Sequence, residues 1–183
     1  MKKVLPKRKS PSKKKVISKK VVKESQSQNI ALKSILVPTD FSEYSKKSLR
    51  YAVSFAKQFN ASITLLYVVE PAVFPSDFGF AQINFPDMEK DMLEKAEQEL
   101  KQIINEVNSE LKITSAVRSG IPFVEVTSFA GEEKMDLIIV ATHGRTGVEH
   151  ILFGSTAEKI IRKAPCPVLV VRAEERDFVD ERV

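Results

Sequence analysis

The sequence predicts an α/β domain with an open five-stranded parallel sheet and helices on both faces. From Ser34 onward, short apolar runs rich in β-branched residues alternate with longer segments whose apolar residues recur every three or four positions. The short runs lack a polar alternation, which is typical of parallel strands that are covered on both sides. Right-handed crossover connections then favour the strand order 3-2-1-4-5.

Five apolar runs are expected to form the strands. The first, Ile35 to Val37, is expected to stop at Pro38, because proline has no N–H to donate to a ladder of hydrogen bonds. The other four are expected at residues 62–69, 113–117, 136–141 and 167–172.

Four segments with helical periodicity separate these strands. The helices are expected from Ser42 to Asn60, from Asp87 to Glu110, from Pro122 to Gly131 and from Ser155 to Lys163. Met88 and Met92 fall on the apolar stripe of the second helix and are expected in the core. Residues 70–86 hold three prolines and four phenylalanines, which predicts a long irregular connection of the kind that is often functional.

Charge is distributed unevenly along the chain. Residues 1–24 carry ten lysines, Arg8 and a single acid, so their net charge is +10, and the remainder carries −5. Residues 1–30 are therefore expected to be a disordered basic tail and linker, residues 31–174 the folded domain and residues 175–183 a C-terminal tail. The basic tail suits nucleic acid or an anionic membrane surface, but it has no aromatic residue to stack on a base and is also consistent with a solubilising extension.

Composition excludes some classes of protein. The longest apolar runs are only a few residues, far short of the ~20 that a transmembrane helix needs. The basic N-terminus is not followed by the apolar stretch of a secretory signal. Cys166 is the only cysteine, so no disulfide can form within the chain, and a cytoplasmic location is expected.

The predicted topology locates a binding site. Ligands of open α/β sheets bind beyond the carboxyl ends of the strands where the winding reverses, which here are the first and fourth strands. The segments that follow these two strands, residues 38–42 and 142–147, are polar and turn-rich and are expected to face each other.

The second of these segments leads into a glycine-rich stretch with the features of an anion site. Gly144, Gly147 and Gly154 precede Ser155 and Thr156, at the start of the last predicted helix. Glycines allow backbone N–H groups to approach an anion closely, and a helix N-terminus supplies unpaired N–H donors. The alternative is a tight turn followed by an ordinary serine N-cap, which needs no ligand. Neither G-x-x-x-x-G-K-[ST] nor G-x-G-x-x-G is present.

Three motifs resemble the universal stress protein family. Gly144, nine further residues, Gly154 and Ser155 are similar to the second half of its G-x-x-G-x9-G-[ST] motif. The segments PTDFSE at residues 38–43 and PCPVLVV at residues 165–171 are similar to family sequences in the same order. The resemblance spans residues 34–172, and Ala141 stands where the motif has its first glycine.

The resemblance implies a flavodoxin-like, Rossmann-like domain that is usually dimeric and that, in one branch of the family, binds ATP. In that branch Pro38, Thr39 and Asp40 would meet the adenine and ribose, and Val68 would line the adenine pocket. The residues that would hold the phosphates are Gly144, Gly154, Ser155 and Thr156. Mg²⁺ would arrive on the phosphates of ATP, and two histidines without ligand-spaced partners predict no other metal site.

The function expected on this basis is a nucleotide-dependent sensor or regulator in the stress response. Arg145 is expected either to pair with a phosphate or to be a solvated loop residue, and His143 to be a hydrogen-bonding loop residue. These are the two residues placed to assist hydrolysis, so a slow ATP-hydrolysing or adenylyl-transferring enzyme on this fold stays an alternative, as does a nucleotide-independent interaction protein. The apolar edge strand Val168 to Val171 is expected to pair with a second copy.

Overall fold

The computed structural model describes residues 30–71, 86–107, 110–144, 154–172 and 177–179. The chain divides into two units, residues 1–30 and residues 31–183. The basic segment lies almost wholly outside the described residues, so its disorder and its partners stay predictions. Most of the connection expected at residues 70–86 also lies outside them. No helix in the described ranges is long and apolar enough to span a membrane.

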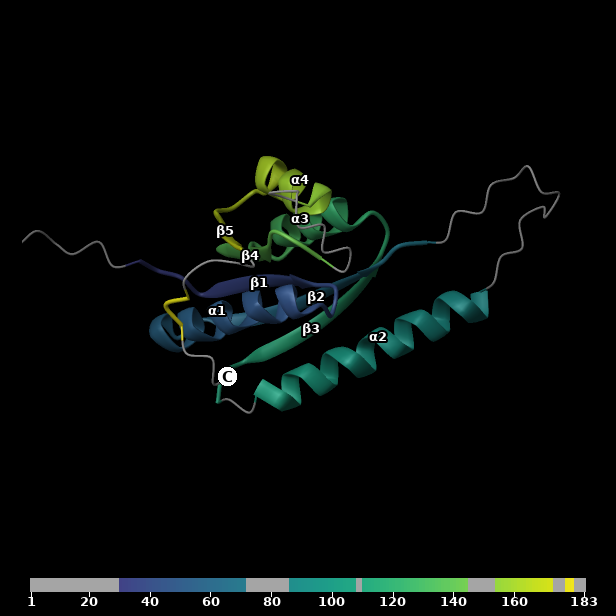
Figure 1. Ribbon diagram of the computed structural model, residues 1–183, viewed down its shortest axis with the longest axis horizontal. Helices are drawn as coiled ribbons and strands as arrows, with labels where there is room; N and C mark the ends of the chain where they lie inside the picture. The colour runs from purple at the N-terminus through teal and green to yellow at the C-terminus, as the bar shows by residue number, and fades with distance from the viewer. Residues whose placement is uncertain (1–29, 72–85, 108–109, 145–153, 173–176, 180–183) are drawn as a thin grey trace, which may run out of the picture. The chain divides into compact units, whose positions relative to one another are not determined.

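Five parallel strands form one sheet in the order β3-β2-β1-β4-β5, which confirms the predicted topology (Figure 1). They are β1 (Ser34–Thr39), β2 (Ser62–Val69), β3 (Ile113–Ser119), β4 (Leu137–Ala141) and β5 (Val168–Val171). β1 is in register with β2 at every position from Ser34 to Thr39, but with β4 only at Ile35 and Leu36. The carboxyl ends of β1 and β4 thus extend beyond their shared register, at the point where the winding reverses.

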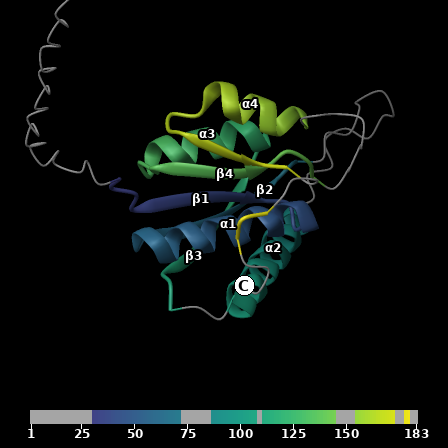
Figure 2. The same ribbon diagram turned by 60° about the vertical axis from the view of Figure 1, so that its left-hand side comes forward.

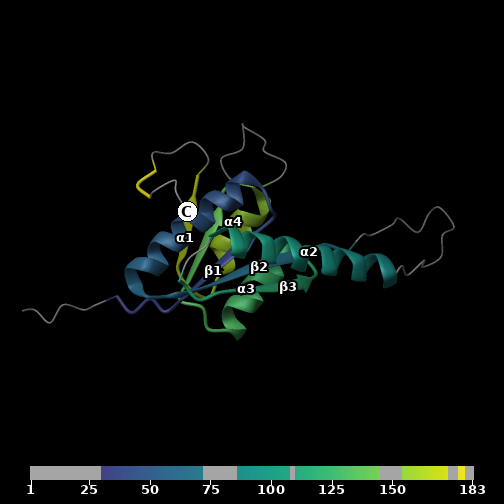
Figure 3. The ribbon, with the colours of Figure 1, turned by 90° about the horizontal axis from the view of Figure 1, so that it is seen from below.

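Helices cover both faces of this sheet. They are α1 (Glu43–Phe59), α2 (Pro86–Val107), α3 (Pro122–Glu132) and α4 (Ser155–Lys163). α1 lies over β1 and β4, and α2 lies over β2 and β3 on the same face, as the view in Figure 3 shows. α3 and α4 pack together on the opposite face (Figure 2). The predicted arrangement of helices on both faces is confirmed.

The first strand is expected to stop at Pro38, because proline lacks an N–H. In the structure it continues to Thr39. Pro38 is in register with Leu66 of β2 and lies beyond Leu36, the last residue of β1 in register with β4. A proline is tolerated there because the strand needs no N–H on its unpaired side. The predicted stop at Pro38 is therefore wrong, because β1 is unpaired on its β4 side at this position.

Two further expectations are corrected within the helices. α3 does not end at Gly131 but continues through it to Glu132, since an interior glycine weakens a helix by only about 1 kcal/mol. Met92 is 43% exposed, whereas Ala96 and Leu100 on the same stripe are buried. The apolar stripe of α2 is therefore buried in the core over only part of the helix. The side chain of Met88 lies outside the described part of the structure.

Two hydrophobic clusters lie on the two sides of the sheet. The cluster beneath α1 and α2 contains Ile35 and Val37 of β1, and the cluster beneath α3 and α4 contains Leu36 of the same strand. Ile139 and Val140 of β4 divide between the clusters in the same way. Because successive side chains point to opposite faces, both faces of the central strands are buried, which explains their continuous apolar runs.

The C-terminal residues 177–179 contact α1. Asp177 lies 2.9 Å from the Lys47 ammonium, and the Tyr51 hydroxyl donates to the same carboxylate at 2.9 Å. Phe178 packs edge-on against Tyr51 with 5.0 Å between ring centroids. Lys47 is only 7% exposed, and a buried ammonium is costly without such a partner. The hydrogen bond from Lys47 holds the pKa of Asp177 below its ordinary value.

Replacing Asp177 by alanine is expected to lower the free energy of unfolding at neutral pH, because the carboxylate that compensates the Lys47 ammonium is lost. The folded pKa of Asp177 is lowered, so its contribution is present above the ordinary carboxyl pKa and disappears as the pH falls through the folded value. Chemical unfolding across the acidic range measures this, and the difference between the parent and Asp177→Ala should shrink as the pH falls.

The matched control is Glu43→Ala on the same helix, which removes an exposed ion pair with Lys46. Exposed pairs of this kind contribute about 0–1 kcal/mol. An effect of Asp177→Ala no larger than that of Glu43→Ala would contradict the structural role of the Lys47 contact.

Candidate functional site

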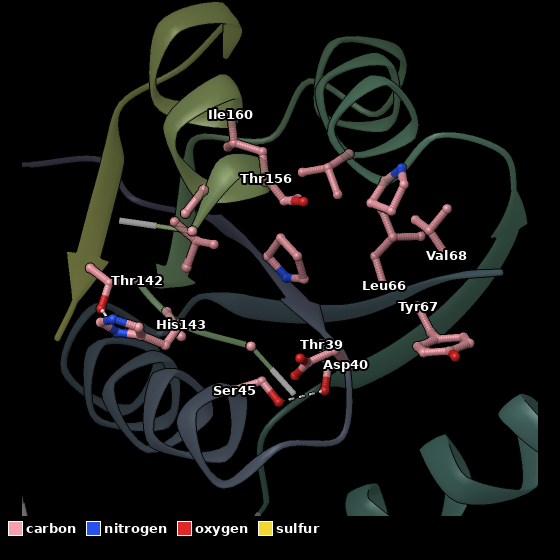
Figure 4. Close-up of a pocket in the computed structure, with 18 of the residues that line it drawn as sticks. Thr39, Asp40, Ser45, Leu66, Tyr67, Val68, Thr142, His143, Thr156 and Ile160 are labelled. Atoms are coloured by element: carbon pink, nitrogen blue, oxygen red, sulfur yellow. Dashed lines mark hydrogen bonds between the residues drawn. The ribbon is translucent and has the colours of Figure 1, made fainter. Parts of the chain in front are cut away.

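A cleft of about 510 Å³ lies at the carboxyl ends of β1 and β4, where the topology predicts a ligand site. Figure 4 shows Thr156 and Ile160 reaching into it from α4, with Leu66 and Val68 opposite them on β2. Its size falls within the usual range for sites of small ligands and cofactors.

The cleft brings together nearly all of the residues that the sequence analysis singled out. Those that line it are Pro38, Thr39, Asp40, Val68, Ala141, His143, Gly144, Gly154, Ser155 and Thr156. Arg145 lies outside the described residues, so its contact with a phosphate stays a prediction. Segments more than a hundred residues apart in the sequence therefore share one cavity.

The turn between β1 and α1 fixes the position of Asp40. Its Oδ1 accepts hydrogen bonds from the Ser42 hydroxyl at 2.6 Å and from the Ser42 N–H at 3.1 Å. Ser42 is the N-cap of α1, and its Oγ accepts from the Ser45 N–H at 3.2 Å. The Asp40 carboxylate is thus held close to the helix N-terminus, where a negative charge is favoured.

The second oxygen of Asp40 lies against Gly144. A Cβ atom built on Gly144 would stand 2.5 Å from Asp40 Oδ2, closer than real Cβ contacts allow. The two loops that the sequence analysis expects to face each other therefore meet here at van der Waals distance. A residue with a Cβ atom at position 144 would have to move the Asp40 carboxylate, which its bonds with Ser42 oppose.

The start of α4 offers backbone N–H donors. Its N-cap is Gly154, which has no side chain with which to cap the helix, so the alternative of an ordinary serine N-cap is wrong. Ser155 and Thr156 are the first two helical residues, and both line the cleft. The Gly154 N–H donates to the Thr142 carbonyl at 2.7 Å, which anchors the helix start to the end of β4. N–H groups in this position suit an anion.

The opposite part of the cleft is apolar. Sequence reasoning found only Pro38 and Val68 of this wall and missed the side chains contributed by Leu66, Pro122, Val126, Val140, Ala157 and Ile160. Strand alternation from Val68 identifies Leu66, and helical spacing from Pro122 identifies Val126. Such a wall suits a flat apolar ring rather than a small ion alone.

Ala141 lines the cleft at the position where the family motif has glycine. Its neighbour Val140 belongs to the cluster on the α3 and α4 face, which is the face that also bears the apolar wall. Side chains alternate along a strand, so the Ala141 methyl group is directed toward the α1 face, away from that wall. Alanine in place of the motif's glycine therefore leaves the apolar part of the cleft open.

His143 and Glu70 also line the cleft. His143 Nδ1 lies 2.8 Å from the Thr142 hydroxyl, and its ring lies 5.8 Å from that of Tyr44. Within the described ranges, no three His, Cys, Asp or Glu side chains group closely enough to hold a metal ion. The arrangement thus combines an apolar wall, a fixed carboxylate and a row of N–H donors.

Gly144→Ala is expected to lower the free energy of unfolding by about 1–2 kcal/mol, because the new methyl group must displace the Asp40 carboxylate from its bonds with Ser42. Denaturant titration measures the change. In an Asp40→Ala background the same substitution should have a smaller effect, since the obstructing oxygen is absent.

Gly131→Ala is the control. A Cβ atom there would have its nearest contact at 3.8 Å from Pro165, and the residue is helical, so this change should stabilise by about 0.5–1 kcal/mol. Equal effects of Gly144→Ala in both backgrounds would contradict the proposed close approach.

Comparisons with known proteins identify relatives of the chain. The sequence profile of the universal stress protein family matches residues 31–172. Universal stress protein MJ0531 of Methanocaldococcus jannaschii is 35% identical over 148 residues, covering 79% of this chain and 85% of that protein. The solved structure of hypothetical protein MJ0577 from the same organism superposes with a TM-score of 0.68 at 30% identity, covering 80% of this chain and 100% of that one.

A universal stress protein solved in complex with cAMP has a TM-score of 0.53 at 22% identity, and covers 79% of this chain and 99% of its own. At that level of identity the likeness concerns the fold alone. The match of the family profile to most of the chain, together with the 35% identity to MJ0531, shows that this protein belongs to the universal stress protein family.

Proposed function

We propose that the protein binds ATP, with Mg²⁺ on its phosphates, in the cleft between β1 and β4, and acts as a nucleotide-dependent sensor or regulator in the stress response. Its place of action in this proposal is the cytoplasm, where its lone Cys166 would be kept reduced. The observation that carries the proposal is the start of α4, whose N-cap Gly154 offers no capping side chain, at a cleft that also holds an apolar wall and a fixed carboxylate.

Each part of a nucleotide has a counterpart in the cleft. The adenine would lie on the apolar wall formed around Leu66 and Val68, and Asp40 would accept a hydrogen bond from the base or from a ribose hydroxyl. The residues that would surround the phosphates are Gly144, Gly154, Ser155 and Thr156. Mg²⁺ would offset the charge of Asp40 and Glu70, the two carboxylates that line the cleft.

Binding has more support than catalysis. Phosphoryl transfer requires a group that orients the attacking water and positive charge that stabilises the transferred phosphoryl group. Of the two residues that the sequence analysis considers for assisting hydrolysis, His143 is the one that the structure describes, and it pairs with the Thr142 hydroxyl. If the purified protein hydrolyses ATP slowly, loss of this hydrolysis when Arg145 is replaced would favour the enzymatic alternative.

The thermal midpoint of nucleotide-stripped protein is expected to rise with ATP and Mg²⁺ and not with GTP. A ligand that binds only the folded state stabilises it by about 2.7 kcal/mol at a hundred times Kd. Ser155→Ala should reduce the shift, because it removes a hydroxyl at the helix start, while Ser128→Ala on α3, outside the cleft, should not. ADP and AMP, each with and without Mg²⁺, show how many phosphates contribute. No shift with any of these nucleotides would favour the nucleotide-independent interaction protein.

We also propose that two copies pair through β5. This strand is an edge of the sheet, and its residues Val168 and Val170 are only partly buried. The carbonyls of Pro167 and Val171 accept hydrogen bonds from Ile138 of β4 and from Thr142, the residue after it. By alternation, the polar backbone groups of Val168 and Val170 face away from the sheet. An exposed row of this kind is a template for a second strand.

Val170→Pro is expected to convert a dimer to a monomer, because it removes an N–H that faces outward without touching the bonds to β4. Light scattering coupled to size exclusion gives the mass of the species in solution. Val170→Thr, which keeps both the N–H and the β-branched shape, should stay dimeric. A parent protein that is monomeric at all concentrations would contradict pairing through β5.

A further inference from the structure

Phe41 adopts a backbone conformation that is unusual for a bulky residue. Its φ angle is +65°, in the left-handed region that glycine, asparagine and aspartate favour. Such a conformation persists only where the surrounding structure holds it, and it is often found at functional sites. Phe41 follows directly after Asp40, the carboxylate of the cleft.

Two interactions hold Phe41 in this conformation. Its ring stacks on Tyr67 of β2 with 4.5 Å between centroids and 27° between the ring planes. Its N–H donates to the Thr39 hydroxyl at 3.1 Å. The two rings line a second, smaller pocket beside α2, together with Met92 and Ala96. The ring of Phe41 is therefore anchored to the sheet on the α2 face.

The left-handed turn at Phe41 determines where Asp40 points. It reverses the chain so that the N–H and hydroxyl of Ser42 both return to Asp40 Oδ1, leaving Oδ2 against Gly144. Phe41 itself is not among the residues that line the cleft. Tyr67, on which the Phe41 ring stacks, does line the cleft, so Phe41 has two routes to a ligand there: the backbone that it shares with Asp40, and the Tyr67 ring. A change that depends on the Asp40 carboxylate distinguishes the first route from the second.

We propose that Phe41 is a positioning residue, whose stack on Tyr67 locks the Asp40 carboxylate in the orientation that the cleft requires for nucleotide binding. This inference rests on the proposed function for its effect on affinity. The anchoring of Asp40 is a property of the free protein and has a readout of its own, because the Ser42 N–H is bonded to Asp40 Oδ1.

A double-mutant cycle with Phe41→Leu and Asp40→Asn tests the inference. ATP with Mg²⁺ is the ligand, and its Kd is measured by calorimetry on the full chain. Phe41→Leu is expected to weaken binding about tenfold in the parent and to have almost no effect in the Asp40→Asn background, because the carboxylate whose orientation it controls is already absent. An equal loss in both backgrounds would overturn the proposal.

Phe41→Gly is the second variant and covers the case in which Phe41→Leu folds poorly. Glycine adopts the +65° angle without strain but has no ring, so the loss of affinity should persist if the ring is the anchor. Phe55→Leu is the matched control. It shortens another phenylalanine packed on the same hydrophobic cluster, far along α1 from the turn, and should leave the Kd unchanged.

Hydrogen exchange of the Ser42 amide, followed by NMR on the free protein, separates this inference from the proposed function. Exchange should accelerate at least severalfold in Phe41→Leu and Phe41→Gly and should be unaffected in Phe55→Leu. If the parent binds no nucleotide but the two Phe41 variants show this acceleration, the proposed function is overturned and the positioning of Asp40 is retained. Unchanged protection of Ser42 in both Phe41 variants would overturn the positioning itself.

Discussion

The cleft depends on the separation of β1 from β4 beyond their shared register. The two strands share a register only at Ile35 and Leu36, although both continue for several residues beyond it. Pro38 is compatible with this separation because it has no N–H that would need a partner on the β4 side. The carboxyl ends of two parallel strands thereby open a cleft in an otherwise continuous sheet, and the loops that follow them become its polar rim.

Local hydrogen bonds hold the polar groups of the rim in place. Asp40 is bonded to the N-terminal turn of α1 through Ser42, and the start of α4 is bonded to the end of β4 through Gly154 and Thr142. Asp40 is therefore anchored to α1, and Gly154 to the residue that follows β4. The approach of Gly144 to Asp40 then follows from the positions of two rigid elements.

The fold could be predicted from the sequence because its signals are local. Alternation of strand-like and helix-like periods, joined to the handedness of crossovers, determines the strand order without knowledge of any contact. Most of the rim residues could also be predicted, since they follow the strands at the switch point. The left-handed conformation of Phe41 and the contact of Gly144 with Asp40 could not, because each depends on residues brought together only by the folded chain. The predictions at Pro38 and Gly131 were wrong for a related reason, because tertiary structure can override local propensity. Pro38 lies where the strand needs no N–H on one side, and Gly131 lies in a helix that tolerates one weak helix former.

The polar groups of the cleft restrict the kind of ligand that it suits. An inorganic anion would satisfy the N–H groups at the start of α4 but would be repelled by the Asp40 carboxylate that lines the same cavity. A purely apolar molecule would use the wall around Leu66 and Val68 and leave the N–H donors without a partner. A molecule that carries a flat ring, hydrogen-bond donors and an anionic group along its length satisfies all three parts at once. That requirement, more than any single residue, is the reason for proposing a nucleotide rather than a free phosphate or a hydrophobic effector.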